Sequence, residues 1–177
     1  MKYTFLIICL VACCNLFGQM YSTISGDVHF ISDAPLEIIE AKSNELQGLF
    51  DAETKSFAFK IYIKSFVGFN SPLQQVHFYE NYMEVRDYPI AVFKGKILEK
   101  IQVGKGKYRA KGILEIHGVK VERTIQIEMD YGENTVVVNS EFIVPLVDHK
   151  IDLPRIVYQK IAEEINVTVS GTLELKE

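Results

Sequence analysis

Cysteine and long basic runs are scarce or absent in this 177-residue chain, and each of these two features argues against a class of protein. The three cysteines all fall within the first fourteen residues, which excludes a zinc ribbon and a disulfide-rich scaffold. No long block of Lys and Arg occurs and the net charge is −4, which disfavours nucleic-acid binding because such binding depends on clustered cations. What is present, an apolar fraction of 48%, excludes intrinsic disorder, and the length suits one domain.

The N-terminus has the pattern of an export signal. Lys2 is followed by an uncharged apolar run over residues 3–12, which is too short to span a bilayer but suits the hydrophobic region of a signal peptide. Cleavage near Gly18 would leave a domain over residues 19–177. Alternatively, Leu10-Val11-Ala12-Cys13 resembles a lipoprotein box, which would end the signal before Cys13 and make that cysteine the lipidated first residue.

Alternation of apolar and polar residues dominates the rest of the chain and predicts strands. The alternating runs cover residues 24–30, 57–63, 108–116, 121–129, 136–144 and 165–175. Turn-forming residues at 51–55, 104–107, 117–118 and 132–134 separate such runs. Each run has one apolar face, as in an antiparallel sheet wetted on one side. We therefore expect an all-β fold, an antiparallel eight-stranded barrel wide enough to hold one small ligand.

Two segments interrupt the alternation and predict one or two short helices beside the barrel. In residues 71–83, Ser71 is a candidate cap, Pro72 lies near the first turn, and Val76, Tyr79 and Met83 share one helical face. Residues 154–162 likewise begin with a proline.

Four histidines, at positions 29, 77, 117 and 149, are the candidates for chemistry, and none has a convincing set of partners. No Gly-x-Ser-x-Gly elbow is present. His149 lies between Asp148 and Asp152, but a metal site would need a second histidine at helical spacing. We expect no catalytic residue, no metal and no cofactor, and His77 has the strongest functional claim of the four. The 11 Phe and 9 Tyr then either fill the barrel or line a cavity within it, and periodicity alone does not separate these alternatives.

Two motifs resemble those of the YceI-like family. Residues 77–95 hold a histidine, an aromatic-rich turn and then Tyr88-Pro89-Ile90-Ala91-Val92-Phe93, which is similar to the family's Tyr-Pro-x-x-x-Phe entering a strand. Residues 112–119 match its Gly-x-Leu-x-x-His-Gly-Val hairpin, and residues 142–154 resemble its penultimate strand and the segment that follows. The resemblance extends over about residues 22–175.

This resemblance implies an exported, extended lipocalin-like barrel that holds a polyisoprenoid lipid, or an isoprenoid quinone, in an apolar cavity for sequestration or transport, without catalysis. Burying hydrocarbon contributes a favourable free energy of about 0.8 kcal/mol per CH₂. Two or three buried five-carbon units would therefore offset an association cost on the order of 10 kcal/mol. The expected ligand-binding residues are the apolar side chains Phe57, Phe59, Ile61, Phe78, Tyr82, Phe93, Leu114, Ile125, Ile127, Phe142 and Val144.

Two other functions stay open: a structural or partner-binding envelope barrel with a filled core, and an envelope enzyme that uses His77 or His117 with Asp148 on an amphiphilic substrate. The expected location is the periplasm or the exterior, or a membrane to which Cys13 anchors the chain. Transient contact with a membrane or membrane protein and a homodimer are further expectations, whereas a nucleic-acid partner is not expected.

Overall fold

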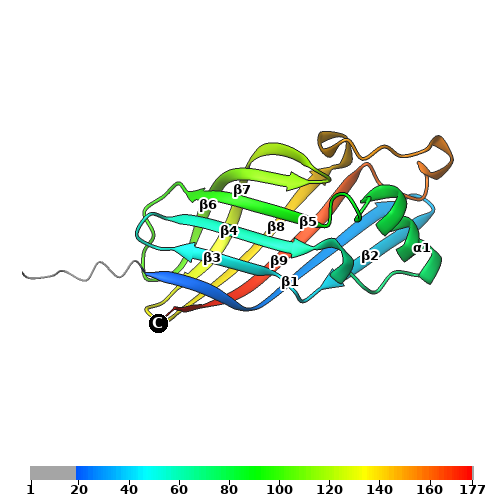
Figure 1. The fold of residues 1–177 in the computed structure, drawn as a ribbon. Coiled ribbons are helices and arrows are strands. Elements are labelled where there is room, and N and C mark those ends of the chain that lie inside the picture. Colours follow the sequence, from blue (N-terminus) through cyan, green and yellow to red (C-terminus); the bar gives the residue numbers. More distant parts are fainter. Residues whose placement is uncertain (1–18, 177) are drawn as a thin grey trace, which may run out of the picture.

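A computed structural model describes residues 19–176, so the expected signal over residues 1–18 and the alternative lipidation of Cys13 lie outside the described residues. Within that range one antiparallel sheet contains nine strands, drawn in Figure 1. They are β1 (Met20–Ala34), β2 (Glu37–Ser43), β3 (Gln47–Asp51), β4 (Ser56–Tyr62), β5 (Ile90–Ile97), β6 (Gly104–Ile116), β7 (Val119–Tyr131), β8 (Thr135–Pro145) and β9 (Glu164–Leu175).

The sheet closes because the long strand β1 pairs on one edge with β9 and on the other with β3. Eight strands thus form the expected antiparallel barrel, and β2 is a ninth strand that extends the wall. The first part of β1 pairs with β3, with Tyr21 opposite Phe50, whereas its last part pairs with β2, with Val28 opposite Ser43. The second pairing lengthens the barrel at the end that carries α1 (Figure 1).

Short helical segments connect the strands. α1 (Pro72–His77) runs into a π-helical turn over Phe78–Tyr82, and 3₁₀ turns span Ile63–Ser65, Leu146–His149 and Arg155–Val157. The helix expected over residues 71–83 is therefore present, and the one expected over 154–162 contains only a single 3₁₀ turn. Only part of this segment faces the interior: Val157 and Ile161 are half-buried, whereas Ile156 is 88% exposed. No helix within residues 19–176 combines the length and the apolar character needed to span a bilayer.

Two local expectations are wrong. Residues 104–107 are not a hairpin turn, because Gly104 already pairs with Tyr131 and β6 continues from there to Ile116. Ile24 does not share the inner face with Val28: the pairing of β1 with β9 shifts between Thr23 and Ser25, and this bulge leaves Ile24 57% exposed.

The predicted turns at 51–55 and 117–118 follow from side-chain and backbone chemistry. Asp51 Oδ1 accepts hydrogen bonds from the amides of Glu53 (2.9 Å) and Thr54 (3.1 Å), which holds the chain reversal between β3 and β4. His117 and Gly118 both have positive φ, 51° and 71°, as the tight two-residue hairpin between β6 and β7 requires.

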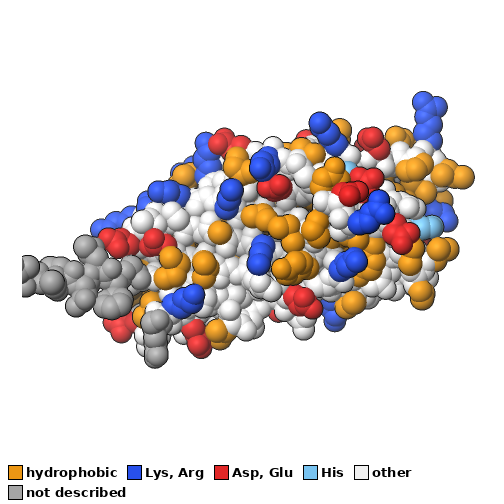
Figure 2. Space-filling model, in the orientation of Figure 1, with side chains coloured by type: hydrophobic (Ala, Val, Ile, Leu, Met, Phe, Trp, Pro, Cys, Tyr) orange, Lys and Arg blue, Asp and Glu red, His pale blue; other side chains and the backbone are white. Residues whose placement is uncertain are grey.

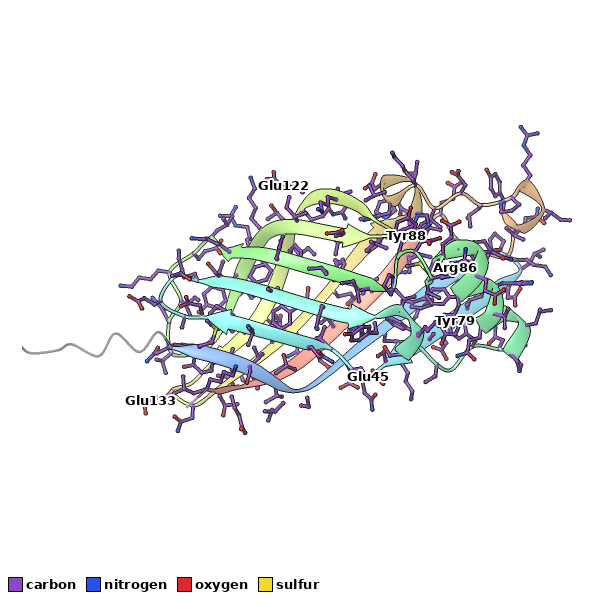
Figure 3. All side chains as sticks on the ribbon, viewed as in Figure 1. Glu45, Tyr79, Arg86, Tyr88, Glu122 and Glu133 are labelled. Atoms are coloured by element: carbon purple, nitrogen blue, oxygen red, sulfur yellow. The ribbon has the colours of Figure 1, made fainter. Side chains whose placement is uncertain are left out.

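One end of the barrel is closed, and buried side chains fill most of it. Its buried cluster is Tyr21, Phe50, Phe57, Ile97, Tyr108, Ala110, Ile125, Ile127, Met129, Val136 and Leu173. The fully buried Tyr21 hydroxyl donates to Glu133 O at 2.9 Å, and burial raises the pKa of this phenol. Glu133 marks this end in Figure 3, opposite Tyr79 at the other end. The remaining interior lies toward α1.

Candidate ligand-binding cavity

A cavity of about 550 Å³ occupies the half of the barrel that lies toward α1. Its size falls in the usual range for small-molecule sites. The interior of the barrel is therefore hollow in this half, which argues against a core that is filled throughout. Apolar side chains from strands on all sides form the wall, among them Val28, Phe30, Ile39, Leu46, Phe59, Ile61, Phe93, Leu114, Phe142, Val144, Ile165, Val167 and Val169.

A lid, defined here as residues 72–82 (α1 and the π-helical turn), covers one side of this cavity. Its start is fixed by a reciprocal cap: the amide of Gln74 donates to Ser71 Oγ at 3.2 Å, and Gln74 Oε1 accepts from the amide of Asn70 at 3.0 Å. Leu73, Gln74, His77, Phe78 and Tyr82 of the lid line the cavity.

Tyr79 fastens the lid to the segment that follows β4. Its hydroxyl lies 2.6 Å from Phe66 O and 3.0 Å from Lys64 O, and Gln75 Nε2 donates to it at 2.8 Å. Figure 3 labels Tyr79 beside α1. The bonds to Phe66 O and Lys64 O join the lid to the rim, so local opening of the lid has to break them.

Aromatic packing holds the inner side of the lid. The Phe78 ring stacks on Phe30 of β1 with centroids 5.3 Å apart, and contacts Phe69 at 5.0 Å and Phe66 at 6.2 Å. Such pairs add about 0.5–1.5 kcal/mol each beyond their buried area. They line the cavity with ring faces and edges rather than polar groups.

Polar side chains gather at the mouth, between the lid, β2 and residues 154–161. Gln74 Nε2 donates to Glu37 Oε1 at 3.0 Å, and His77 and Lys160 also line the cavity. Gln74, His77 and Lys160 carry N–H donors, so a ligand that extends to this part of the cavity meets groups that can donate hydrogen bonds to it.

A second, deep chamber of about 80 Å³ lies toward the closed end. Its wall includes Phe50, Phe57, Ile97, Ala110, Ile125, Ile127, Met129, Val138 and Leu173. The Ser140 hydroxyl, also in the wall, donates to Gln126 O at 2.8 Å and is thus satisfied by the protein.

All eleven residues that the sequence predicts for ligand binding line one of these two spaces. Those around the main cavity are Phe59, Ile61, Phe78, Tyr82, Phe93, Leu114, Phe142 and Val144. Phe57, Ile125 and Ile127 line only the deep chamber. Sequence reasoning missed Val28 and Phe30, which the alternation over residues 24–30 could have supplied. It also missed Phe66 and Phe69, which follow β4 outside any regular strand and carry no periodic signal.

The histidines considered for catalysis are not brought together. His77 lines the mouth, whereas His117 and Asp148 do not line the cavity. The imidazole nitrogens of His117 lie 2.8 Å from Glu84 Oε2 and 3.3 Å from His149 O. Arg123 Nη1 donates to Asp148 Oδ2 at 3.1 Å. Both groups thus connect structural segments beside the cavity.

His149 is fully buried, and its Nδ1 lies 3.3 Å from Val119 O, while Nε2 has no hydrogen-bond partner within residues 19–176. Burial away from water lowers its pKa, so the neutral ring is the favoured form. Among residues 19–176 no three His, Cys, Asp or Glu side chains gather into a group that could hold a metal ion.

The comparison with family models matches the YceI-like domain over residues 18–173. This chain is a member of the YceI-like family. A search of the curated proteins finds no match. The YceI-like barrel nevertheless has clear counterparts among solved structures, which share its fold at low sequence identity.

A polyisoprenoid-binding domain from Saccharophagus degradans, implicated in plant cell wall breakdown, superposes with a TM-score of 0.74 at 13% identity, over 88% of this chain and 98% of that one. BcnA of Burkholderia cenocepacia gives 0.69 at 16% identity, over 83% and 95%. The Campylobacter jejuni YceI protein gives 0.57 at 22% identity, over 72% and 78%. The YceI-like barrel fold is therefore shared with these proteins.

Proposed function

We propose that this protein is an exported, non-enzymatic binding protein that encloses the chain of a polyisoprenoid lipid or isoprenoid quinone, for sequestration or transport. The observation that carries the proposal is the cavity itself: about 550 Å³ of largely apolar interior beneath an aromatic lid, with Gln74, His77 and Lys160 among its few polar lining residues. Membership of the YceI-like family supports it, as does the Saccharophagus neighbour, described as a polyisoprenoid-binding domain.

The energetics favour a ligand with a long hydrocarbon chain. Each five-carbon unit buried is worth about 4 kcal/mol at about 0.8 kcal/mol per carbon, so a few units bind without any polar contact. The donors of Gln74 and Lys160 at the mouth suit the carbonyl oxygens of a quinone or the oxygens of a prenol or its phosphate. A headgroup would remain at the mouth while the chain extends inward.

A blocked cavity tests the proposal directly. Ala91 lines the cavity and Ala58 is exposed on the neighbouring strand β4, so Ala91→Trp and Ala58→Trp place the same new ring inside and outside. We expect delipidated wild type and Ala58→Trp to bind a polyprenol and a quinone at one per chain, and Ala91→Trp to lose at least tenfold in affinity. Equal binding by the three proteins would contradict the proposed site.

Export is the second part of the proposal. The apolar run over residues 3–12 supports it, and the family match begins only at residue 18. The intact mass of the protein recovered from the envelope fraction or the medium tests it. Loss of residues 1–18 supports cleavage near Gly18, and an acylated chain that begins at Cys13 supports the lipoprotein alternative. A full-length intracellular chain contradicts both.

Exposed apolar side chains at the mouth support transient contact with a membrane. Leu36, Leu73 and Ile156 are 65%, 63% and 88% exposed, and they come from three segments that meet there. The amide of Leu36 donates to Gln159 O at 2.8 Å, and Leu73 also lines the cavity. Figure 2 shows hydrophobic side chains gathered at this end of the molecule. A ligand would thus pass between the cavity and a bilayer along apolar surface.

Vesicle flotation tests this contact. We expect Leu73→Ser with Ile156→Ser to reduce vesicle binding, and Val103→Ser, which removes a side chain 78% exposed in the β5–β6 connection at the closed end, to leave it unchanged. Equal losses in both variants would contradict a contact made by the mouth. The expected homodimer stays a prediction.

A further inference from the structure

Five residues line both the main cavity and the deep chamber, and three of them are the phenylalanines Phe59, Phe93 and Phe142. Phe59 and Phe93 belong to the adjacent strands β4 and β5, and Phe142 belongs to β8, which is separated from β5 by two strands. The partition layer, as we name these three rings, is therefore the aromatic part of the wall between the two spaces. Beyond it lies apolar surface, and such cavities stay dry and accept apolar groups.

Backbone geometry holds the partition layer in place. Phe59 is paired across the sheet with Phe93 on one side and with Gly48 on the other. The Phe59 ring occupies the space that a Cβ at position 48 would need, so glycine is required there for the ring to lie as it does. Phe57 packs on Phe93 with centroids 4.9 Å apart, which supports the layer from below.

The deep chamber has room for a short piece of hydrocarbon. Its volume of about 80 Å³ is several times the roughly 10–15 Å³ that a single water-sized group needs, which is room for about one branched five-carbon unit. The main cavity is about 550 Å³, so joining the deep chamber to it would add a small volume at the inner end, beyond the partition layer.

We infer that the partition layer is a length stop: it ends the path of the bound isoprenoid chain above the deep chamber and so sets how many five-carbon units the protein encloses. This inference rests on the proposed function. Opening the layer turns the deep chamber into a subsite for the distal end of a longer chain. Phe59, Phe93 and Phe142 are then residues that determine chain-length specificity.

The test is a competition among polyprenols that differ by one five-carbon unit. Delipidated protein is incubated with an equimolar series, re-isolated, and the bound prenols are quantified by mass spectrometry. For Phe142→Ala we expect the longest well-bound prenol to gain at least one unit, with about a tenfold rise in the ratio of longer to shorter chains, because burial of another unit is strongly favourable. Phe142 forms no ring pair with the other two, so their packing is retained.

Phe50→Ala is the matched control. It removes the same ring, from a side chain that lines the deep chamber but not the main cavity, and the ring pair that Phe50 forms is with Tyr21 rather than with the partition layer. We expect its chain-length distribution to equal that of wild type. If Phe142→Ala does not fold, Gly48→Ala provides the second variant, since its Cβ displaces the Phe59 ring from the layer without deleting it.

The outcomes separate this inference from the proposed function. An unchanged distribution in a folded, prenol-binding Phe142→Ala or Gly48→Ala protein overturns the length stop. An equal lengthening in Phe50→Ala also overturns it, because the chain would then already reach the deep chamber in wild type. Failure of wild type to bind any prenol overturns the proposed function instead.

Discussion

Removing the Tyr79 hydroxyl tests directly how the lid is held against the barrel. Tyr79→Phe keeps the ring, and so its contacts with Phe69 and Phe78, but removes the hydrogen bonds to Phe66 O and from Gln75 Nε2. Each such bond contributes about 0.5–1.5 kcal/mol net, so the free energy of unfolding should fall by about 1–3 kcal/mol.

Part of this loss should also lower the cost of opening the lid. Opening breaks the bond from Tyr79 to Phe66 O but not the one from Gln75, which is itself a lid residue, so Tyr79→Phe should lower the cost of opening by about 0.5–1.5 kcal/mol. A loss of about 1.4 kcal/mol corresponds to tenfold faster release of a bound prenol. Hydrogen exchange should accelerate at the amides of Met83 and Val85, which donate to Phe78 O and Tyr79 O at 2.9 Å.

Urea unfolding, hydrogen exchange and transfer of a bound prenol to vesicles measure these effects. Tyr62→Phe is the control, because Tyr62 has an exposed side chain on β4 outside the lid. The reasoning is refuted if Tyr79→Phe unfolds at the same urea concentration as Tyr62→Phe and releases the prenol at the same rate.

Two further predictions concern His149, in the 3₁₀ turn after β8, and Gly118, in the hairpin between β6 and β7. Burial lowers the pKa of His149 below its ordinary 6.5, so as the pH falls from 6.5 the unfolded chain takes up a proton that the folded chain does not, and the free energy of unfolding decreases. His149→Phe should remove this part of the decrease, so urea titrations at neutral and acidic pH should differ less for the variant than for wild type. An identical pH dependence in the two proteins would contradict the prediction. Gly118 has a φ of 71°, and a Cβ added there would meet the Tyr88 ring. Gly118→Ala should therefore lower the free energy of unfolding by about 1–3 kcal/mol in the same urea titration. Gly132→Ala, in the next hairpin at a glycine without positive φ, should lower it by less.

The strands that alternate strongly could be predicted from the sequence because burial on one face repeats with the period of the backbone. Phe57 and Ile61, and likewise Ile125 and Ile127, face inward as their spacing requires. β2 has no such signal: its inner face carries Ala41 and Ser43 beside Ile39, while Ile38 on the outer face is 59% exposed. Its position is set by pairing with β1 rather than by its own side chains.

The cavity could be predicted only in part, since its lining depends on what closes each end. Periodicity places Phe57 and Phe59 on one face but does not reveal that the first lies below the partition layer and the second within it. The lid depends on contacts between distant segments, such as Phe30 with Phe78 and Tyr79 with Phe66 O, which no local pattern encodes. The bulge at residues 23–25 likewise follows from closure of β1 against β9.

The most direct test of the central claim is the identity of the molecule that the cavity holds. The protein is purified from its own envelope without detergent, its intact mass is measured under native conditions, and an organic extract is analysed by mass spectrometry. We predict one isoprenoid lipid or quinone per chain, lost in Ala91→Trp and retained in Ala58→Trp. A chain free of lipid, or one that carries only straight-chain fatty acids, would contradict the account.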